Sequence, residues 1–227
     1  MIWLVTILSL FTGPAFAEGE AAGTPPTFKM DGSAALMTNY MEYGITQTTK
    51  DPSLQGTFWF NWGPQFRLGL WGSNTNFENS DTHLHLKVAA EIKVPFSEHA
   101  GMTLAYFDHR FYKPETREGN TVELRLTFFD WTIFYEQISN FEGTQTKGSS
   151  YGFEKELPVF GNWKWKNTVG YVSVTEPGLN NFFWWETALG IKPGGIFYEV
   201  GGTYNSSASQ FSGSADPMIF LRATVNF

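Results

Sequence analysis

The feature that most constrains the fold is an alternation of apolar and polar residues with a period of two. Across residues 82–94, every even-numbered residue from 84 onward is apolar, and every odd-numbered residue except Ala89 is polar. Side chains on a strand point alternately to opposite faces, so this segment predicts a strand with one apolar and one charged face. A slip of one residue would carry two lysines to the apolar face, at about 2–4 kcal/mol each in the middle of a bilayer.

The same alternation recurs along the chain and predicts about twelve strands. Their expected ranges are 33–44, 53–61, 65–73, 82–94, 100–110, 119–129, 131–139, 148–157, 163–174, 182–191, 195–204 and 216–227. Tight connections (61–64, 95–99, 129–131, 158–162 and 192–195) alternate with longer polar ones (45–50, 74–81, 111–118, 140–147, 175–181 and 205–215). This asymmetry is typical of outer-membrane barrels, which have short periplasmic turns and longer external loops.

We therefore expect an all-β fold, a single antiparallel transmembrane β-barrel of about 12 strands over residues 18–227. A soluble sandwich also alternates and is the main alternative. The barrel is favoured by charge on one face of strand after strand and by aromatic residues suited to interfacial girdles. These are Trp131, Tyr135, Trp163, Trp165, Trp184 and Trp185. Phe227 ends an alternating strand, as in the assembly signal that the outer-membrane insertion machinery reads in such barrels.

Residues 1–17 have the layout of a signal peptide. An apolar run over 2–11 precedes a Thr-Gly-Pro breaker and the cleavage-site pattern Ala15-Phe16-Ala17, although no basic residue comes before the run. An N-terminal helical anchor is the alternative, but the run is too short to span a bilayer as a helix. We expect export to the outer membrane of a Gram-negative bacterium, with membrane lipid and the insertion machinery as partners.

The composition excludes several classes of function. The 227 residues include no cysteine, so disulfides, thiol catalysis and cysteine metal sites are excluded. The net charge of −7 and the lack of a basic run argue against nucleic-acid binding. We expect no cofactor, and the sequence leaves the oligomeric state open.

Three short stretches resemble a known family. They are residues 38–49 (TNYMEYGITQTT), 52–56 (PSLQG) and 69–74 (GLWGSN) followed by Phe77. The pattern resembles Gcw_chp, a family of conserved Gram-negative envelope proteins. Glu42 and Tyr43 depart from the aromatic and the arginine that the family usually has before the glycine, and residues 84–87 depart from its later Leu-Asp-x-Tyr segment. The resemblance implies a β-barrel-like fold and leaves the function open.

The polar face of the predicted strands supplies the candidate site residues. The predicted pore-lining residues are Arg67, His83, His85, Lys87, Glu91, Lys93, Glu123, Arg125, Lys164, Lys166, Glu186, Glu199 and Arg222. Glu42, Glu136, Glu154 and Glu156 are expected on the same face, so cations and anions nearly balance. Such a balance does not predict strong ion selectivity, because selective pores usually carry rings of one sign.

Chemistry beyond passive passage has little support in the sequence. His83 and His85 share a face, but a zinc site needs three or four ligands, so we interpret them as lumen histidines. Asp108 and His109 point to opposite faces, and no nucleophile motif accompanies a possible Ser80, Asp81 and His83 cluster at the rim. We expect no enzyme activity and no catalytic residue.

The leading hypothesis is a narrow, weakly selective, porin-like channel for small polar solutes. The alternative is a closed barrel that acts through its loops, since twelve strands lie between the filled eight-stranded barrels and the open sixteen-stranded ones. Residues 205–214 are expected to form a mobile loop, with an inward-folded constriction loop as the alternative. Glycines within strands are expected to relieve crowding, or else to leave room for a solute.

Overall fold

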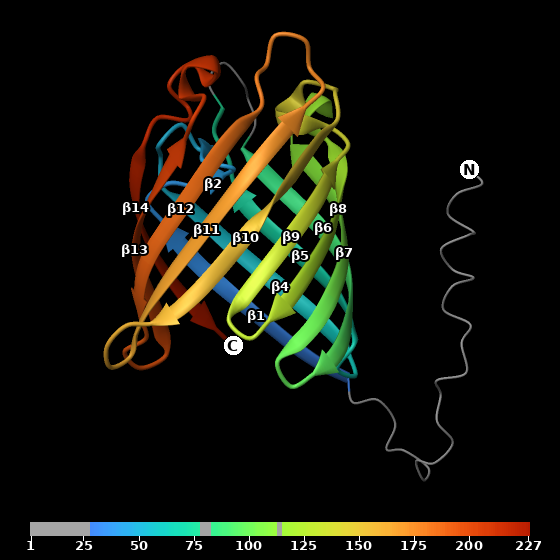
Figure 1. Ribbon diagram of the computed structural model, residues 1–227, viewed down its shortest axis with the longest axis vertical. Helices are drawn as coiled ribbons and strands as arrows, with labels where there is room; N and C mark the ends of the chain where they lie inside the picture. The colour runs from blue at the N-terminus through green and yellow to red at the C-terminus, as the bar shows by residue number, and fades with distance from the viewer. Residues whose placement is uncertain (1–27, 78–82, 113–114) are drawn as a thin grey trace, which may run out of the picture.

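The chain forms a closed barrel of twelve antiparallel strands (Figure 1). The computed structural model describes residues 28–77, 83–112 and 115–227; the predicted signal peptide lies outside them. The barrel strands are β1 (Phe28–Met37), β4 (Ser53–Trp62), β5 (Phe66–Asn74), β6 (Leu84–Ser97), β7 (Ala100–Tyr112), β8 (Gly119–Phe128), β9 (Trp131–Ile138), β10 (Gly148–Pro158), β11 (Trp163–Val174), β12 (Phe182–Ile191), β13 (Ile196–Asn205) and β14 (Met218–Asn226).

Shorter elements lie between these strands. A separate two-stranded hairpin consists of β2 (Met41–Glu42) and β3 (Ile45–Thr46). Three 3-10 helices, η2 (Glu115–Arg117), η3 (Phe141–Gly143) and η4 (Ala208–Phe211), belong to the longer connections. No helix in the described ranges is long and apolar enough to cross a lipid bilayer.

The prediction of a twelve-stranded antiparallel barrel is confirmed. Figure 1 shows strongly tilted strands, with the longer connections and the 3-10 helices at the upper end and the tight turns at the lower end. We call these the loop end and the turn end. Eleven of the twelve predicted strands overlap the observed ones closely, because alternation marks the wall of a barrel whose two faces meet different solvents.

The first predicted strand, 33–44, is right over residues 33–37 and wrong over 38–44. The observed β1 starts at Phe28 and ends at Met37, and residues 38–50 leave the wall and fold inward. We call residues 38–50 the lumenal segment. Its hairpin turns at Tyr43 and Gly44, which both have positive φ values (53° and 73°), the conformation of a type I′ turn.

Polar side chains explain why the lumenal segment is not part of the wall. The hydroxyls of Thr46 and Thr48 both donate to Asn39 Oδ1, at 2.5 and 3.0 Å, and all three residues are buried. A lipid-facing strand has to present apolar side chains, and this segment has no continuous apolar face. Inside the barrel its polar groups bond with one another.

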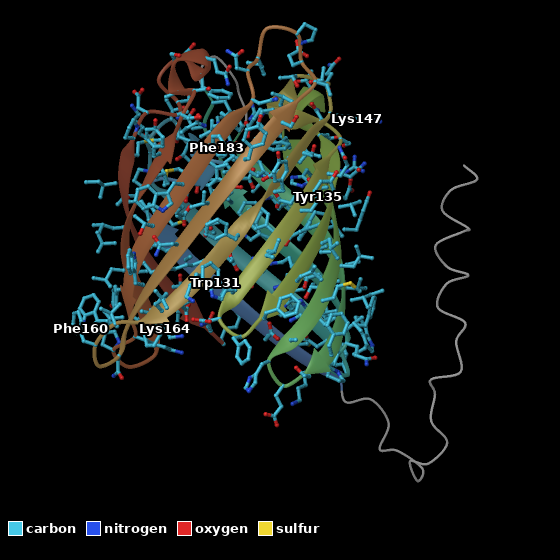
Figure 2. The ribbon with its side chains drawn as sticks, in the orientation of Figure 1. Trp131, Tyr135, Lys147, Phe160, Lys164 and Phe183 are labelled. Atoms are coloured by element: carbon cyan, nitrogen blue, oxygen red, sulfur yellow. The ribbon has the colours of Figure 1, made fainter. Side chains whose placement is uncertain are left out.

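The outer face of the barrel is apolar, with aromatic residues toward both ends. In Figure 2, Trp131 and Phe160 lie toward the turn end, and Tyr135 and Phe183 lie nearer the loop end, as expected of interfacial girdles. Trp184 was predicted in such a girdle, but it points inward and packs against Phe134 and Tyr43. Two tryptophans are adjacent at 184 and 185, so only one of them can face lipid.

The barrel closes between β1 and β14. Ser33 to Met37 pair with Asn226 to Arg222, and Gly32 exchanges both backbone hydrogen bonds with Phe227, at 2.9 and 3.0 Å. The Phe227 ring lies over Gly32, where an added Cβ would come within 2.7 Å of it. Glycine at position 32 therefore leaves room for the terminal aromatic ring at the seam.

Candidate functional site: the lumen

Ion pairs line the inner wall in a ladder that crosses from strand to strand. Arg125 on β8 contacts Glu123 at 2.8 Å and Glu154 on β10 at 2.5 Å, and Lys166 on β11 reaches the same Glu154 at 3.6 Å. On β14, Arg222 contacts Glu199 at 2.5 Å. These contacts hold long charged side chains against the wall.

Further ion pairs between neighbouring strands lie on both sides of this group. Arg222 also approaches Glu186 on β12, at 3.9 Å. On the other side of the barrel, Arg67 Nε on β5 donates to Glu91 on β6 at 2.7 Å, and the guanidinium lies 4.0 Å from the centre of the Trp59 ring. The charges that sequence analysis found nearly balanced are thus largely neutralised in pairs.

The remaining predicted site residues differ in their surroundings. Lys93 and Lys164 are exposed toward the turn end, and Lys164 contacts Glu156 at 2.5 Å. His83 precedes β6 and is exposed, so it is not part of the strand wall. Ser80 and Asp81, which sequence analysis considered beside it, lie outside the described residues.

His85 and His109 form a buried pair on neighbouring strands. His85 Nε2 lies 3.1 Å from His109 Nδ1, and the His85 ring stacks on Phe111 with centroids 3.9 Å apart. His85 is fully buried and points inward, as its alternation predicts. Within the described ranges, no group of three or more His, Cys, Asp or Glu residues has a geometry that could hold a metal ion.

The lumenal segment is attached to the wall through Glu42. Its carboxylate forms an ion pair with Lys87 on β6. Burial alone would raise the pKa of Glu42, but Lys87, with smaller contributions from His85 and His109, holds that pKa well below its ordinary value. Glu42 was predicted on a wall strand; it instead reaches the lumen from the hairpin.

A second attachment links three loops at the loop end. Arg117, after β7, forms an ion pair with Glu142, after β9, and the amide of Gln47 in the lumenal segment donates to the same carboxylate at 3.2 Å. The Arg117 guanidinium also lies 3.7 Å from the centre of the Phe77 ring. Burial raises the pKa of Glu142, and Arg117 opposes this effect.

An apolar cluster covers part of the loop end. Ile45 of the lumenal segment packs with Ile138, Phe141, Val172, Phe182 and Ala215, all buried, and Phe211 packs against them. The loop over 205–214, for which the sequence predicts mobility, packs against this cluster through Ala208 and Phe211. Gln210 exchanges hydrogen bonds with the backbone of Asn180, at 2.8 and 3.0 Å, and η4 lies over the cluster.

Three cavities lie in sequence from the loop end into the barrel. The outermost has a volume of about 230 Å³, and the next, of about 40 Å³, shares Arg117 and Glu142 with it. The third, of about 280 Å³, shares Glu42, Tyr43 and His109 with the second. We call the second cavity the constriction and the third the chamber. Neighbouring cavities thus share charged lining residues, and the smallest of the three lies beside the lumenal segment.

Glycines in the wall accommodate aromatic rings that lie flat on the inner surface. A Cβ at Gly69 would meet the Trp59 ring at 2.4 Å, and one at Gly170 would meet the Trp184 ring at the same distance. Gly201 has the same relation to Phe220, at 2.5 Å. The space that these glycines leave is filled by side chains and is not open to a solute.

Sequence reasoning missed the residues of the constriction. Arg117, Glu142 and Gln47 come from connections, which carry no periodic signal. Only Gln47 lies within a resemblance stretch, and the stretches 38–49, 52–56 and 69–74 contact one another in the structure. Tyr40 packs on Trp71 with ring centroids 5.3 Å apart, and Asn74 Oδ1 accepts a hydrogen bond from the backbone N–H of Leu54 at 2.6 Å.

Solved porins have the same fold. Neither a protein-family model nor a curated protein matches the sequence. The NanC porin is 7% identical with a TM-score of 0.59, covering 88% of this chain and 99% of its own. The KdgM porin is 10% identical with a TM-score of 0.56, covering 88% of this chain and 98% of its own. At these identities the likeness shows a fold shared with porins.

Proposed function

We propose that this protein is a narrow, porin-like channel for small polar solutes in the outer membrane of a Gram-negative bacterium. The observation that carries the proposal is the series of three cavities that share polar lining residues from the loop end to the chamber. The porin fold and the apolar outer face support it. Passage would be passive, and neither catalysis nor a cofactor is part of the proposal.

The lumen supports weak rather than strong selectivity along most of its length. Cations and carboxylates of the same or nearby strands pair with one another, so the residues that the structure describes form no ring of a single sign around the lumen. The NanC and KdgM structures are titled as porins, and one KdgM structure is described as a complex with disordered oligogalacturonate. We do not extend that ligand to this chain.

We also propose Gcw_chp membership and a role for Phe227 in assembly. The membership rests on the stretches 38–49, 52–56 and 69–74, which together build the lumenal segment and its attachment to β4 and β5. The role of Phe227 is supported by its backbone pairing with Gly32 at the closing seam.

A closed barrel that acts through its loops is the second candidate function. The apolar cluster around Phe141 and Phe182 favours it, because a packed cluster excludes water from that part of the loop end. In this reading the constriction would be too narrow to pass solute.

Single-channel conductance in a planar bilayer distinguishes the two candidates. We expect the mature chain to show small discrete steps, and the double variant Arg117→Ala, Glu142→Ala to show larger ones, because it removes the ion pair beside the constriction. The matched control is Lys164→Ala, Glu156→Ala, which removes an exposed pair at the turn end. Silence from both the wild type and the constriction variant, with a folded barrel in each, would reject the channel.

A further inference from the structure

The charges that line the chamber are not balanced, although the charges of the whole lumen nearly are. Five carboxylates line it, against Lys87, Arg125 and Lys166. The lining carboxylates are Glu42, Glu123, Glu136, Glu154 and Glu186. Arg222 contacts Glu186 from outside the lining and offsets one of these charges. The chamber therefore has one carboxylate more than the cations that contact its lining, in a part of the barrel where burial strengthens electrostatic interactions.

Glu136 is the carboxylate without a cation. Glu42, Glu123, Glu154 and Glu186 each contact a lysine or arginine, whereas Glu136 has no ion pair with any residue that the structure describes. Its Oε2 is buried and accepts no hydrogen bond within the same ranges. Tyr43 interacts with Glu136 from the lumenal segment, but it is neutral, so the protein places no positive group on this carboxylate and its Oε2 is left available to a ligand in the chamber.

The strand register makes this position less favourable still. Glu136 on β9 stands directly opposite Glu123 on β8. Like charges in direct cross-strand register destabilise a sheet. Arg125 engages Glu123, at 2.8 Å, but shows no contact with Glu136. A positive group in the chamber would relieve the repulsion and complete the coordination of Glu136.

Aromatic rings form the other part of the chamber wall. Phe107, Phe134, Trp184 and Tyr43 line it beside the carboxylates. Aromatic faces attract cations and also cover apolar groups. The volume of about 280 Å³ is just below the usual range for ligand pockets, which suits a small ligand.

We infer that the chamber is a binding site for a small organic ammonium ion with an apolar body, in which Glu136 accepts hydrogen bonds from the ammonium group. This inference rests on the proposed function, because it names the class of solute that the route would favour. The inference predicts selectivity for cations at the chamber, whereas weak selectivity is expected elsewhere in the lumen. The rest of the lumen stays electrically balanced.

Binding to the folded barrel in detergent tests the inference without requiring conductance. The probes are benzylammonium, benzyl alcohol and benzoate, three molecules with one ring and a positive, neutral or negative head group. Isothermal titration calorimetry at pH 7 should show benzylammonium binding most tightly. Glu136→Gln should weaken that binding about tenfold or more, as expected for a hydrogen bond to a charged group. Glu156→Gln, an exposed carboxylate outside the chamber, should leave it unchanged.

The outcomes separate this inference from the proposed function. Equal binding of benzylammonium and benzyl alcohol, or full binding by Glu136→Gln, would overturn the ammonium site even if the barrel conducts ions. Selective binding by a barrel that never conducts would support the site and reject the channel. The comparison of the three probes on the wild type remains decisive if the variant does not fold.

Discussion

Single residues set the shape of the inner surface by how closely they let neighbouring side chains approach. Gly69 lies under the ring of Trp59, which in turn lies beneath the guanidinium of Arg67. The sequence showed that glycines interrupt the strands, but it did not show what occupies the space above them. That depends on which residues stand opposite in the register, and alternation does not specify the register between strands.

At this scale, we predict that Gly69→Val destabilises the barrel by about 1–3 kcal/mol, because its Cβ would overlap the Trp59 ring and overpack the wall. Gly56→Val is the control. Gly56 is on the lipid-facing side, and the nearest atom to an added Cβ is 3.9 Å away. Urea unfolding followed by tryptophan fluorescence measures both variants, and equal midpoints would contradict the account of Gly69.

Elements that leave the wall decide whether the lumen is open. The lumenal segment is the clearest example, because the alternation around it suggested a wall strand over 33–44. The polar residues of this segment were visible in the sequence, but the sequence did not show that the segment folds into the lumen. The contacts that hold it, such as Lys87 with Glu42 and Gln47 with Glu142, join residues that lie far apart in the chain.

The pKa of Glu42 predicts how the attachment of this segment depends on pH. Because that pKa is lowered in the folded state, the Glu42 contribution is fully present above the ordinary value of about 4.5 and is lost as the pH falls below it. We therefore expect the effect of Glu42 on the unit conductance to be constant from pH 8 to 5 and to weaken at lower pH, where the segment loosens and the conductance rises.

Glu42→Gln provides the matched variant for this prediction. It should raise the conductance already at pH 7 and remove the part of the acid response that is due to Glu42. His85, His109 and the chamber carboxylates also face this region, so the informative quantity is the difference between the two proteins at each pH. An identical pH profile for both would show that Glu42 does not hold the segment.

The whole molecule is defined by two solvents, lipid outside and a polar lumen inside. The sequence predicted the lipid-facing and lumen-facing sides well, because each strand has its own alternation of apolar and polar residues. Side-chain pairing within the lumen was beyond prediction, since one arginine faces several carboxylates and only the three-dimensional register selects among them. Arg125 contacts both Glu123 and Glu154, on β8 and β10.

Substitutions on β8 test the two faces. Leu124→Arg places a charge on the lipid side and should cost about 2–4 kcal/mol near the bilayer midplane, which blocks assembly. Thr127→Arg, which is exposed on the inner side, should be tolerated. Thr121 alternates onto the same inner face, but it is buried below the loop end and should not accept arginine. Outer-membrane levels of the three variants measure this, and equal levels would refute the assigned faces.

The seam between β1 and β14 has a consequence for the order of folding in time. Every other pairing in the wall joins consecutive barrel strands, with the hairpin β2–β3 inserted only between β1 and β4, so these pairs close comparatively short loops. The seam instead joins the first and last strands, and its loop-closure entropy is the largest in the molecule. Until Gly32 meets Phe227, the nascent sheet has two unpaired edges that lipid cannot satisfy. We therefore expect the pairing of β1 with β14 to be the slow step. Until it forms, the two unpaired sheet edges need to be shielded from lipid.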